Sequence, residues 1–404
     1  MQSKLFTLSA AFLFLSVSVF AQKLITSEDS LNNGLSKSAT TIGGYGNAFY
    51  QRNNNLGTSK LDLERFVLFT GHKFTDRISV FTELEVEDAK VTGGESGGEI
   101  AVEQAYLKFN LNPNQYIVAG LFLPRIGILN ENHLPNTFNG NERNYVETFV
   151  LPSTWREIGV GLYGNMNGLP LNYSLGLVSG VSSGMFEHGS GIREGRFEGR
   201  NASGNNLAVT ASLQYYIGDL KAQVSGYYGG TVGVSKRKAD SLGLNSGIFG
   251  TPLAIGEGDI EYTHGGFSLR ALGAIVSIPD ASKINRAYAN NTPKTEYGAY
   301  LELGYDLLYG RKAGEKQLIV FVRDEKFDLN ASIPSNGITD GTLDQNHIVA
   351  GLTYLPIRNV AIKADVRLIH TGRQNPELII NPNPVALPYQ QSNNLVNVGM
   401  AFSF

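Results

Sequence analysis

The chain has 404 residues, of which 17% are charged, and its formal net charge at pH 7 is −3. This balance gives no reason to expect a nucleic-acid partner or a polybasic membrane patch. Cysteine is absent, which excludes a disulfide framework and thiolate chemistry. The 47 Gly, 19 Tyr and 21 Phe residues favour many strands and turns over a helical domain.

The N-terminus has the pattern of a secretory signal peptide over residues 1–21. Lys4 supplies a positive charge, an apolar run follows it, and Ala21 ends a small-x-small sequence. The run is short for a transmembrane helix, and no stop-transfer sequence follows. We therefore expect export, cleavage after Ala21, a short periplasmic segment over 22–40, and a folded unit over 41–404.

Alternation of apolar and polar residues recurs along the rest of the chain and predicts amphipathic strands. Many of these strands reach ten residues or more, which is long for a globular sheet and suits a tilted membrane crossing of about 9–11 residues. The least regular pair is 257–264 and 266–278, because Arg270 disturbs the alternation. We place about sixteen strands, near 41–50, 60–71, 77–89, 99–110, 115–123, 154–163, 169–180, 206–217, 220–230, 257–264, 266–278, 295–309, 316–328, 346–355, 359–370 and 394–404.

The joins between these strands alternate in length. Short joins such as "HKFTDR", "LNPNQ" and "LPIRN" alternate with long ones such as 124–153 and 181–205. Short turns at one end and long loops at the other are typical of an outer-membrane β-barrel, with the turns in the periplasm. A soluble sandwich or propeller would need a partner sheet over each apolar face, and the chain has no blade repeat.

The C-terminal segment "NLVNVGMAFSF" alternates strictly and ends on an aromatic residue. Val398, Met400, Phe402 and Phe404 share one face, which we expect to point at outer-membrane lipid and to be read by the barrel-assembly machinery. Closure of this last strand against the first would remove the exposed edge.

Charged residues opposite apolar ones are candidates for the barrel lumen. They could simply keep the channel wet, or the acids near residue 85 could face basic strands across the pore and set up a transverse field. These lumen candidates are Glu83, Glu85, Glu87, Lys108, Lys221, Arg270, Glu302, Arg323, Glu325, Lys363, Asp365 and Arg367.

The order of several segments resembles a known family. "FTELEVEDAK", "VEQAYLKFN" and "IVAGLFLPRIGILNENHLPNTFNGNERNYVETFVLPSTWREIGVGLYG" are followed by "IPDASKINRAYANN" and "EYGAYLELGYDLL". This order is similar to Bacteroidota outer-membrane porins of the phosphate-selective porin O and P family, most specifically between Ala119 and Gly164. The resemblance implies a sixteen-stranded barrel, often a homotrimer, with the third loop, 124–153, folded inward as a constriction.

The candidate constriction loop has nearly balanced charge. The family's anion path depends on a ladder of arginines and a cluster of lysines, but this loop contains no lysine. The resemblance therefore implies a general porin for small hydrophilic solutes or ions, and the charge balance predicts weak or slightly cation-leaning selectivity without a dedicated phosphate site. The charged residues of the loop are Arg125, Glu131, Glu142, Arg143 and Glu147.

A second long loop carries "GIREGRFEGR". Arg193, Arg196 and Arg200 could form a basic vestibule, but the interleaved Glu194 and Glu198 would neutralise much of its field. The pattern favours an ordinary exposed loop.

Evidence for catalysis is thin. His188 and Ser190 lie in a Gly-flanked loop without an orienting third group, and the six His are scattered with no pair at metal-ligand spacing. We expect no enzyme activity, no cofactor and no metal. Trp155 is expected at the extracellular membrane interface.

Two functions stay open on sequence alone. One is a passive diffusion porin, and the other is a plugged or narrow barrel that acts as a receptor, an adhesin or a structural protein. An active transporter of the plugged type is disfavoured, because such barrels have about 22 strands and 22–40 is too short to form the plug.

Overall fold

The computed structural model describes residues 39–88, 98–311, 314–378 and 389–404. The predicted signal peptide, 1–21, lies outside these residues. So does the predicted periplasmic segment, 22–40, except for its last two residues, which already belong to the first strand.

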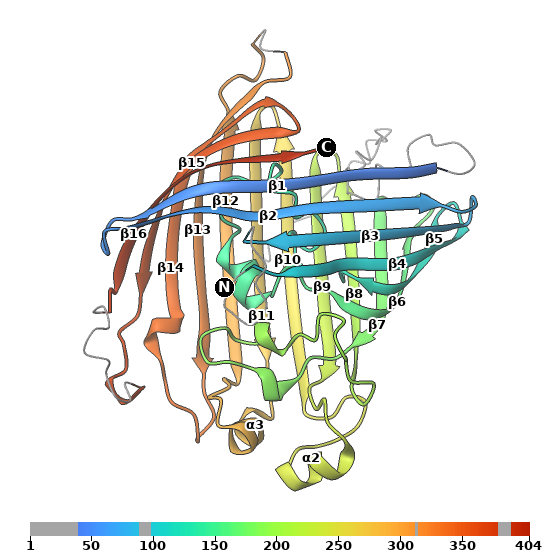
Figure 1. The fold of residues 1–404 in the computed structure, drawn as a ribbon, viewed down its shortest axis with the longest axis vertical. Coiled ribbons are helices and arrows are strands. Elements are labelled where there is room, and N and C mark those ends of the chain that lie inside the picture. The colour runs from blue at the N-terminus through green and yellow to red at the C-terminus, as the bar shows by residue number, and fades with distance from the viewer. Residues whose placement is uncertain (1–38, 89–97, 312–313, 379–388) are drawn as a thin grey trace, which may run out of the picture.

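In this described part of the chain, sixteen antiparallel strands close into one barrel (Figure 1). The strands are β1 (Ala39–Asn53), β2 (Thr58–Lys73), β3 (Ile78–Glu87), β4 (Ile100–Asn112), β5 (Gln115–Phe122), β6 (Glu157–Asn165), β7 (Leu171–Ser179), β8 (Leu207–Ile217), β9 (Leu220–Gly230), β10 (Pro252–His264), β11 (Phe267–Ser277), β12 (Thr295–Asp306), β13 (Gln317–Ser332), β14 (Asp344–Ile357), β15 (Val360–Thr371) and β16 (Ser392–Ser403). The predicted fold class is confirmed.

Short helical segments lie in the longer joins between strands. Among the described residues, no helix is sufficiently long and apolar to span a membrane. The helical segments are η1 (Val146–Val150), η2 (Ser183–Met185), η3 (Arg193–Gly195), α2 (Lys236–Leu242), α3 (Ala281–Tyr288), η4 (Gly341–Leu343) and η5 (Pro376–Leu378).

The barrel closes where the two ends of the chain meet. β1 pairs with β16, with Tyr45 opposite Ser403, and Gly44 and Phe404 exchange backbone hydrogen bonds of 3.0 and 2.9 Å. Because every strand has two neighbours, no strand edge is left to be satisfied in lipid.

The outer surface of the barrel is apolar and its inner surface is polar. On β16, Val398 and Met400 are about half exposed, whereas Asn397 and Ala401, the residues on either side of this pair in the sequence, are buried inside the barrel. The same alternation along β12 sets exposed Leu301 against buried neighbours on the lumen side. A closed barrel with this apolar outer belt is suited to the outer membrane.

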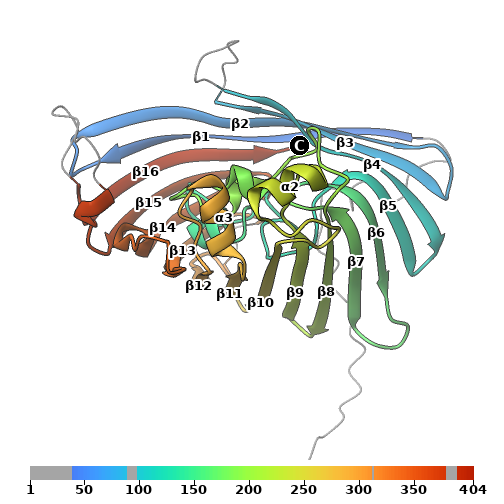
Figure 2. The ribbon, with the colours of Figure 1, turned by 90° about the horizontal axis from the view of Figure 1, so that it is seen from below.

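The joins confirm the predicted asymmetry. The turns after β4, β8, β10 and β14 have two residues each, whereas the joins after β5 and β7 run over 123–156 and 180–206. Figure 1 shows the C-terminus at the end of the barrel opposite α2 and α3, which belong to the long-loop end, and Figure 2 shows the barrel from that end, with both helices in front of the strands.

The irregular strand pair is real but longer than predicted. β10 begins at Pro252 instead of 257, and it joins β11 through Gly265 and Gly266, whose φ angles of 58° and 79° suit a tight turn. Leu253 and Ile255 point inward into a buried cluster, so the usual pattern of polar residues inside is reversed there. That reversal hid the start of the strand.

A first prediction concerns the closing seam. Phe404→Ser should lower the yield of folded barrel markedly, because Phe404 is 60% exposed on the lipid face. Ser403→Ala, on the neighbouring residue, should fold nearly as well as wild type. Heat-modifiable migration on gels measures the folded fraction, and equal yields for the two variants would contradict the assembly role of this face.

A second prediction concerns orientation in the membrane. The chain lacks cysteine, so single Cys variants report one site each. Ser241→Cys in α2 should react with a membrane-impermeant maleimide on whole cells. Arg358→Cys, in the turn between β14 and β15, should react only after the outer membrane is permeabilised. The reverse labelling pattern would invert the assigned topology.

Candidate functional site

The loop between β5 and β6 enters the barrel and is fastened to the far wall. The ammonium group of Lys363, on β15, donates hydrogen bonds to the carbonyl oxygens of Pro135, Phe138 and Gly140 at 2.5, 2.7 and 2.8 Å. Lys363 is buried and lies 4.2 Å from the centre of the Phe138 ring. Three backbone carbonyls therefore replace the water that this cation would otherwise need.

A carboxylate next to this lysine holds the same stretch of the loop. Asp365 accepts hydrogen bonds from the backbone N–H and the side-chain amide of Asn141 at 2.8 and 2.6 Å. Asn397, on β16, donates to the other oxygen of Asp365 at 2.8 Å. The positive charge of Lys363 and the negative charge of Asp365 thus both position the loop.

A third set of contacts comes from β12, β13 and β15. Arg323 pairs with Glu302 and Glu325 at 3.0 and 2.7 Å and donates to the carbonyl oxygen of Asn139 at 3.3 Å. Arg367 pairs with Glu142 at 3.3 Å. The strand residues of this set are predicted lumen candidates, and the structure places them in contact with the loop.

The first part of the loop is fixed to β8 and β9. Glu131 pairs with Lys221 at 2.6 Å and with Arg125 at 3.4 Å, and it accepts hydrogen bonds from Gln214. Burial alone would raise the pKa of the Glu131 carboxyl, but Lys221 and Arg125 outweigh burial and lower the pKa to about 2. This anchor therefore stays charged at neutral and mildly acidic pH.

The end of the loop packs as a small core of its own. Glu147 is fully buried and accepts hydrogen bonds from the Leu129 N–H at 2.7 Å and from the Tyr300 hydroxyl at 3.0 Å. Burial raises the pKa of Glu147. The η1 helix approaches β12 so closely that a Cβ at Gly298 would lie 2.9 Å from Val146.

The loop between β7 and β8 also turns inward, which corrects its prediction as an ordinary exposed loop. Arg193 donates to the carbonyl oxygens of Thr148 and Ser153 at 2.8 and 2.9 Å, and Arg196 donates to that of Pro152 at 2.8 Å. Both arginines therefore hold the last part of the β5–β6 loop. Burial lowers the pKa of Arg193 to about 10.

Trp155 lies inside the barrel, so its predicted place at the membrane interface is wrong. The side chain is 1% exposed, its Nε1–H donates to Glu157 at 2.7 Å, and its ring centre lies 4.7 Å from that of Tyr227. The indole is part of the core that the two inward loops form with the wall.

A cavity of about 880 Å³ remains between these loops and the β2–β4 wall. Acidic groups dominate the strand side, whereas most of the arginines come from the inward loops. Its acidic lining residues are Asp62, Glu64, Glu85, Glu87, Asp88, Glu99, Glu142, Glu194 and Glu198. Its basic lining residues are Lys60, Arg65, Arg143, Arg156, Arg193, Arg196 and Arg200.

Only part of the predicted site borders this cavity. Of the loop candidates, Glu142 and Arg143 line it, and of the lumen candidates, Glu85 and Glu87 line it. Most of the remaining candidates pair with the loop or with other side chains of the lumen, because unpaired charges inside the barrel would be costly. Among these, Arg270 donates to the Thr137 carbonyl at 2.9 Å, and Lys108 and Glu83 contact Tyr116 and Gln104.

Sequence reasoning missed several residues of the lumen. Arg65 pairs with Glu85 at 3.3 Å, and Arg156 pairs with Glu198 at 3.0 Å; both arginines border the cavity. Arg65 alternates with apolar residues on β2, a signal that could have been used. Arg156 precedes β6, where no periodicity marks it.

Solved structures with the same fold are outer-membrane channels and porins. The outer-membrane channel DcaP of Acinetobacter baumannii gives a TM-score of 0.54 at 14% identity, covering 92% of this chain and 99% of that chain. The anion-selective porin from Comamonas acidovorans gives 0.52 at 14% identity, covering 91% and 100%. OmpT of Vibrio cholerae in a trimer form gives 0.51 at 11% identity, again covering 91% and 100%. At these identities the likeness concerns the fold.

The protein is an outer-membrane β-barrel with the porin fold, as its closed sheet, apolar belt and structural neighbours agree. No family model matches the sequence. An uncharacterized protein of Aquifex aeolicus (strain VF5) is 32% identical over 342 residues, covering 81% of this chain and 75% of that protein. The chain belongs to the same family as this Aquifex aeolicus protein.

A third prediction tests the anchoring of the loop. Lys363→Met should cost at least about 1.5–3 kcal/mol of the free energy that holds the loop on β15, the contribution of a single hydrogen bond to a charged group, because it removes three such bonds. Hydrogen exchange of residues 134–141, followed by mass spectrometry, should accelerate accordingly. The control is Lys326→Met, whose pair with Asp344 is about 44% exposed and should contribute less than about 1 kcal/mol. Unchanged exchange in Lys363→Met would contradict the anchoring role.

Proposed function

We propose that this protein is a passive diffusion channel for small hydrophilic solutes or ions. The observation that carries the proposal is the charged cavity of about 880 Å³ inside a closed barrel that two inward loops enter. A sixteen-stranded barrel is wide enough for an aqueous channel, and inward loops reduce it to a selective path.

The cavity lining supports weak selectivity. Nine acidic and seven basic side chains border the cavity, so its net charge is small and negative. Fields from exposed charges are screened over about 10 Å at 0.1 M salt, which limits the preference that such an imbalance can produce. We therefore propose a mild cation preference without a dedicated phosphate site. Kinship with the phosphate-selective porin O and P family stays a proposal based on the order of segments over 80–164.

In this proposal, fewer loop residues form the constriction than the sequence suggested. Glu142 and Arg143 face the strand residues Glu85 and Glu87 across the cavity, whereas Arg125, Glu131 and Glu147 hold the loop in place. A plugged barrel acting as a receptor, an adhesin or a structural protein is the competing function. We favour the channel because the cavity lining is strongly charged instead of packed.

The proposal includes the partners expected of a porin. We propose that the protein is not an enzyme, that it assembles through the barrel-assembly machinery into outer-membrane lipid, and that it forms a homotrimer. Trimer formation is supported by the trimer form of OmpT, a protein with the same fold.

A fourth prediction tests the channel directly. Purified wild-type protein in a planar bilayer should give stable single-channel currents with a small cation-leaning reversal potential in a KCl gradient. Arg200→Gln and Glu87→Gln remove opposite charges from the cavity lining, so they should shift the reversal potential toward cations and toward anions, respectively.

The matched control for these variants is Glu315→Gln, an exposed acid in the turn between β12 and β13 that should leave the reversal potential unchanged. Absence of conductance in correctly folded wild-type protein would favour the plugged barrel. A strong anion preference with block by phosphate would contradict the proposed selectivity.

A further inference from the structure

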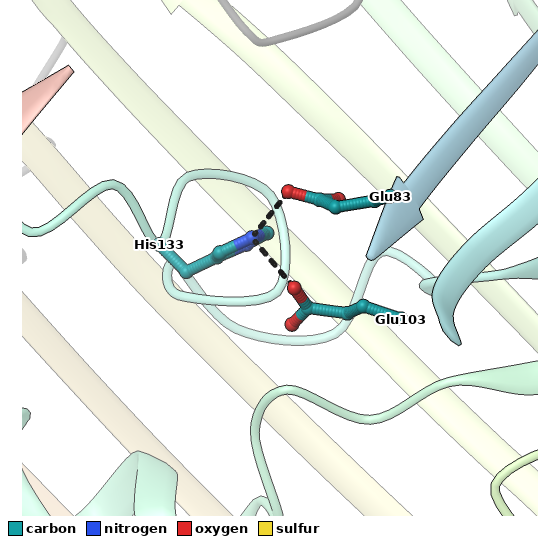
Figure 3. Close-up of side chains that lie close together, drawn as sticks. All are labelled: Glu83, Glu103 and His133. Carbon is teal, nitrogen blue, oxygen red and sulfur yellow. Dashed lines mark ion pairs between the residues drawn. The ribbon is translucent and has the colours of Figure 1, made fainter. Parts of the chain in front are cut away.

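Three ionisable side chains from distant parts of the sequence converge inside the barrel. Glu83 lies on β3, Glu103 on β4, and His133 on the inward loop, whose tip reaches the wall at this point (Figure 3). They are 1%, 0% and 5% exposed, so each is more than nine-tenths buried. None of the anchors described above uses them.

The spacing of these groups is wider than hydrogen bonding requires. The Nε2 atom of His133 lies 3.8 Å from Glu83 Oε1 and 3.8 Å from Glu103 Oε2. One ligand atom from each of the three residues lies within 4.8 Å of the other two. Tetrahedral zinc with bonds of about 2.0–2.2 Å holds its ligand atoms roughly 3.3–3.6 Å apart. The two distances to His133 would shorten by a few tenths of an ångström and the distance between the carboxylates by up to about an ångström, which side-chain rotation can supply.

One carboxylate oxygen that faces the gap is not satisfied by the protein. Glu83 Oε1, which lies 3.8 Å from His133 Nε2, is buried and has no hydrogen-bond partner among the described residues. An unpaired buried carboxylate oxygen is costly, which argues for a bound group that the contacts of the polypeptide do not supply.

Neighbouring side chains hold the two carboxylates in place. Gln104 donates to Glu83 Oε2 at 2.7 Å, and the Tyr45 hydroxyl donates to Glu103 Oε2 at 3.1 Å. The Tyr45 ring also packs edge-on against His133, with ring centres 5.8 Å apart. Partners of this kind orient metal ligands and hold them in place before the ion arrives.

We propose that Glu83, Glu103 and His133 form a binding site for a divalent transition metal, with zinc as the best match. One imidazole nitrogen and two carboxylate oxygens suit zinc, and water can complete the tetrahedron. Two negative charges are brought together at this site, and a dication neutralises them.

The consequence of this site is mechanical. The loop is fastened to β15 through Lys363 and Asp365, and the metal would fasten it to β3 and β4, which β16, β1 and β2 separate from β15 in the closed sheet. The loop would then be tied to two separate parts of the wall, and the cavity beside it would keep its shape. Burial lowers the pKa of His133, but Glu103 and Glu83 outweigh burial and raise the pKa, so a proton on the imidazole competes with a metal ion for this site.

The test is zinc binding by the full-length folded barrel in detergent, stripped with a chelator and dialysed. Titration calorimetry and elemental analysis should give one zinc per chain. Cobalt added to the stripped protein should give the intense visible absorption of a tetrahedral N/O site. Glu83→Gln and His133→Gln should each weaken zinc binding at least about tenfold, the range seen when a ligand or its support is lost.

The matched control is His188→Gln, which removes a histidine paired with the single carboxylate of Asp340 at 2.8 Å and should leave the affinity unchanged. Absence of stoichiometric zinc in folded wild-type protein would overturn the proposal. Equal affinity in the Glu83, His133 and His188 variants would also overturn it. If the Glu83 or His133 variant does not fold, the wild-type stoichiometry and the cobalt spectrum decide alone. Neither result depends on conductance, so the channel proposal stands or falls separately.

Discussion

The need to satisfy every backbone polar group within lipid determines the rest of this structure. Only a closed sheet meets that need with strands, so β16 must pair with β1. The backbone groups of Phe404 and Gly44 form hydrogen bonds at this seam. Sixteen strands then enclose a bore too wide for the wall's own side chains to fill. The inward loops occupy part of the space that closure of the sheet creates.

Filling that bore with polypeptide places charges where water would otherwise be. A buried cation or carboxylate is tolerated only when hydrogen bonds replace its hydration. Lys363 meets this condition with three backbone carbonyls, and Asp365 meets it with the backbone and side chain of Asn141. The lumen charges therefore serve first as the attachment points of the loop.

The sequence was sufficient for the barrel but only partly for its interior. Alternation with a period of two is a local signal, so all sixteen strands could be predicted. The largest misses were the start of β10, where Leu253 and Ile255 point inward, and the last four residues of β13, where Leu329 is buried. Loop contacts are non-local: Lys363 meets Gly140 across 223 positions, and no pattern in the sequence records that pairing. The convergence of His133 with two strand carboxylates was hidden for the same reason.

The arrangement of charge around the cavity follows from which charges the wall strands carry and which the inward loops carry. Acids such as Glu85 and Glu87 belong to the wall, whereas Arg143 and Arg200 belong to the loops that follow β5 and β7. Opposite charges on facing walls nearly cancel in sum but not in space, so their field runs across the path more than along it. In the channel we propose, a field of that kind would orient dipolar solutes and sort ions only mildly. Attachment of the loops to the wall is what holds this arrangement of charge in place, because Lys363, Asp365 and Arg367 fix the stretch of loop that carries Arg143.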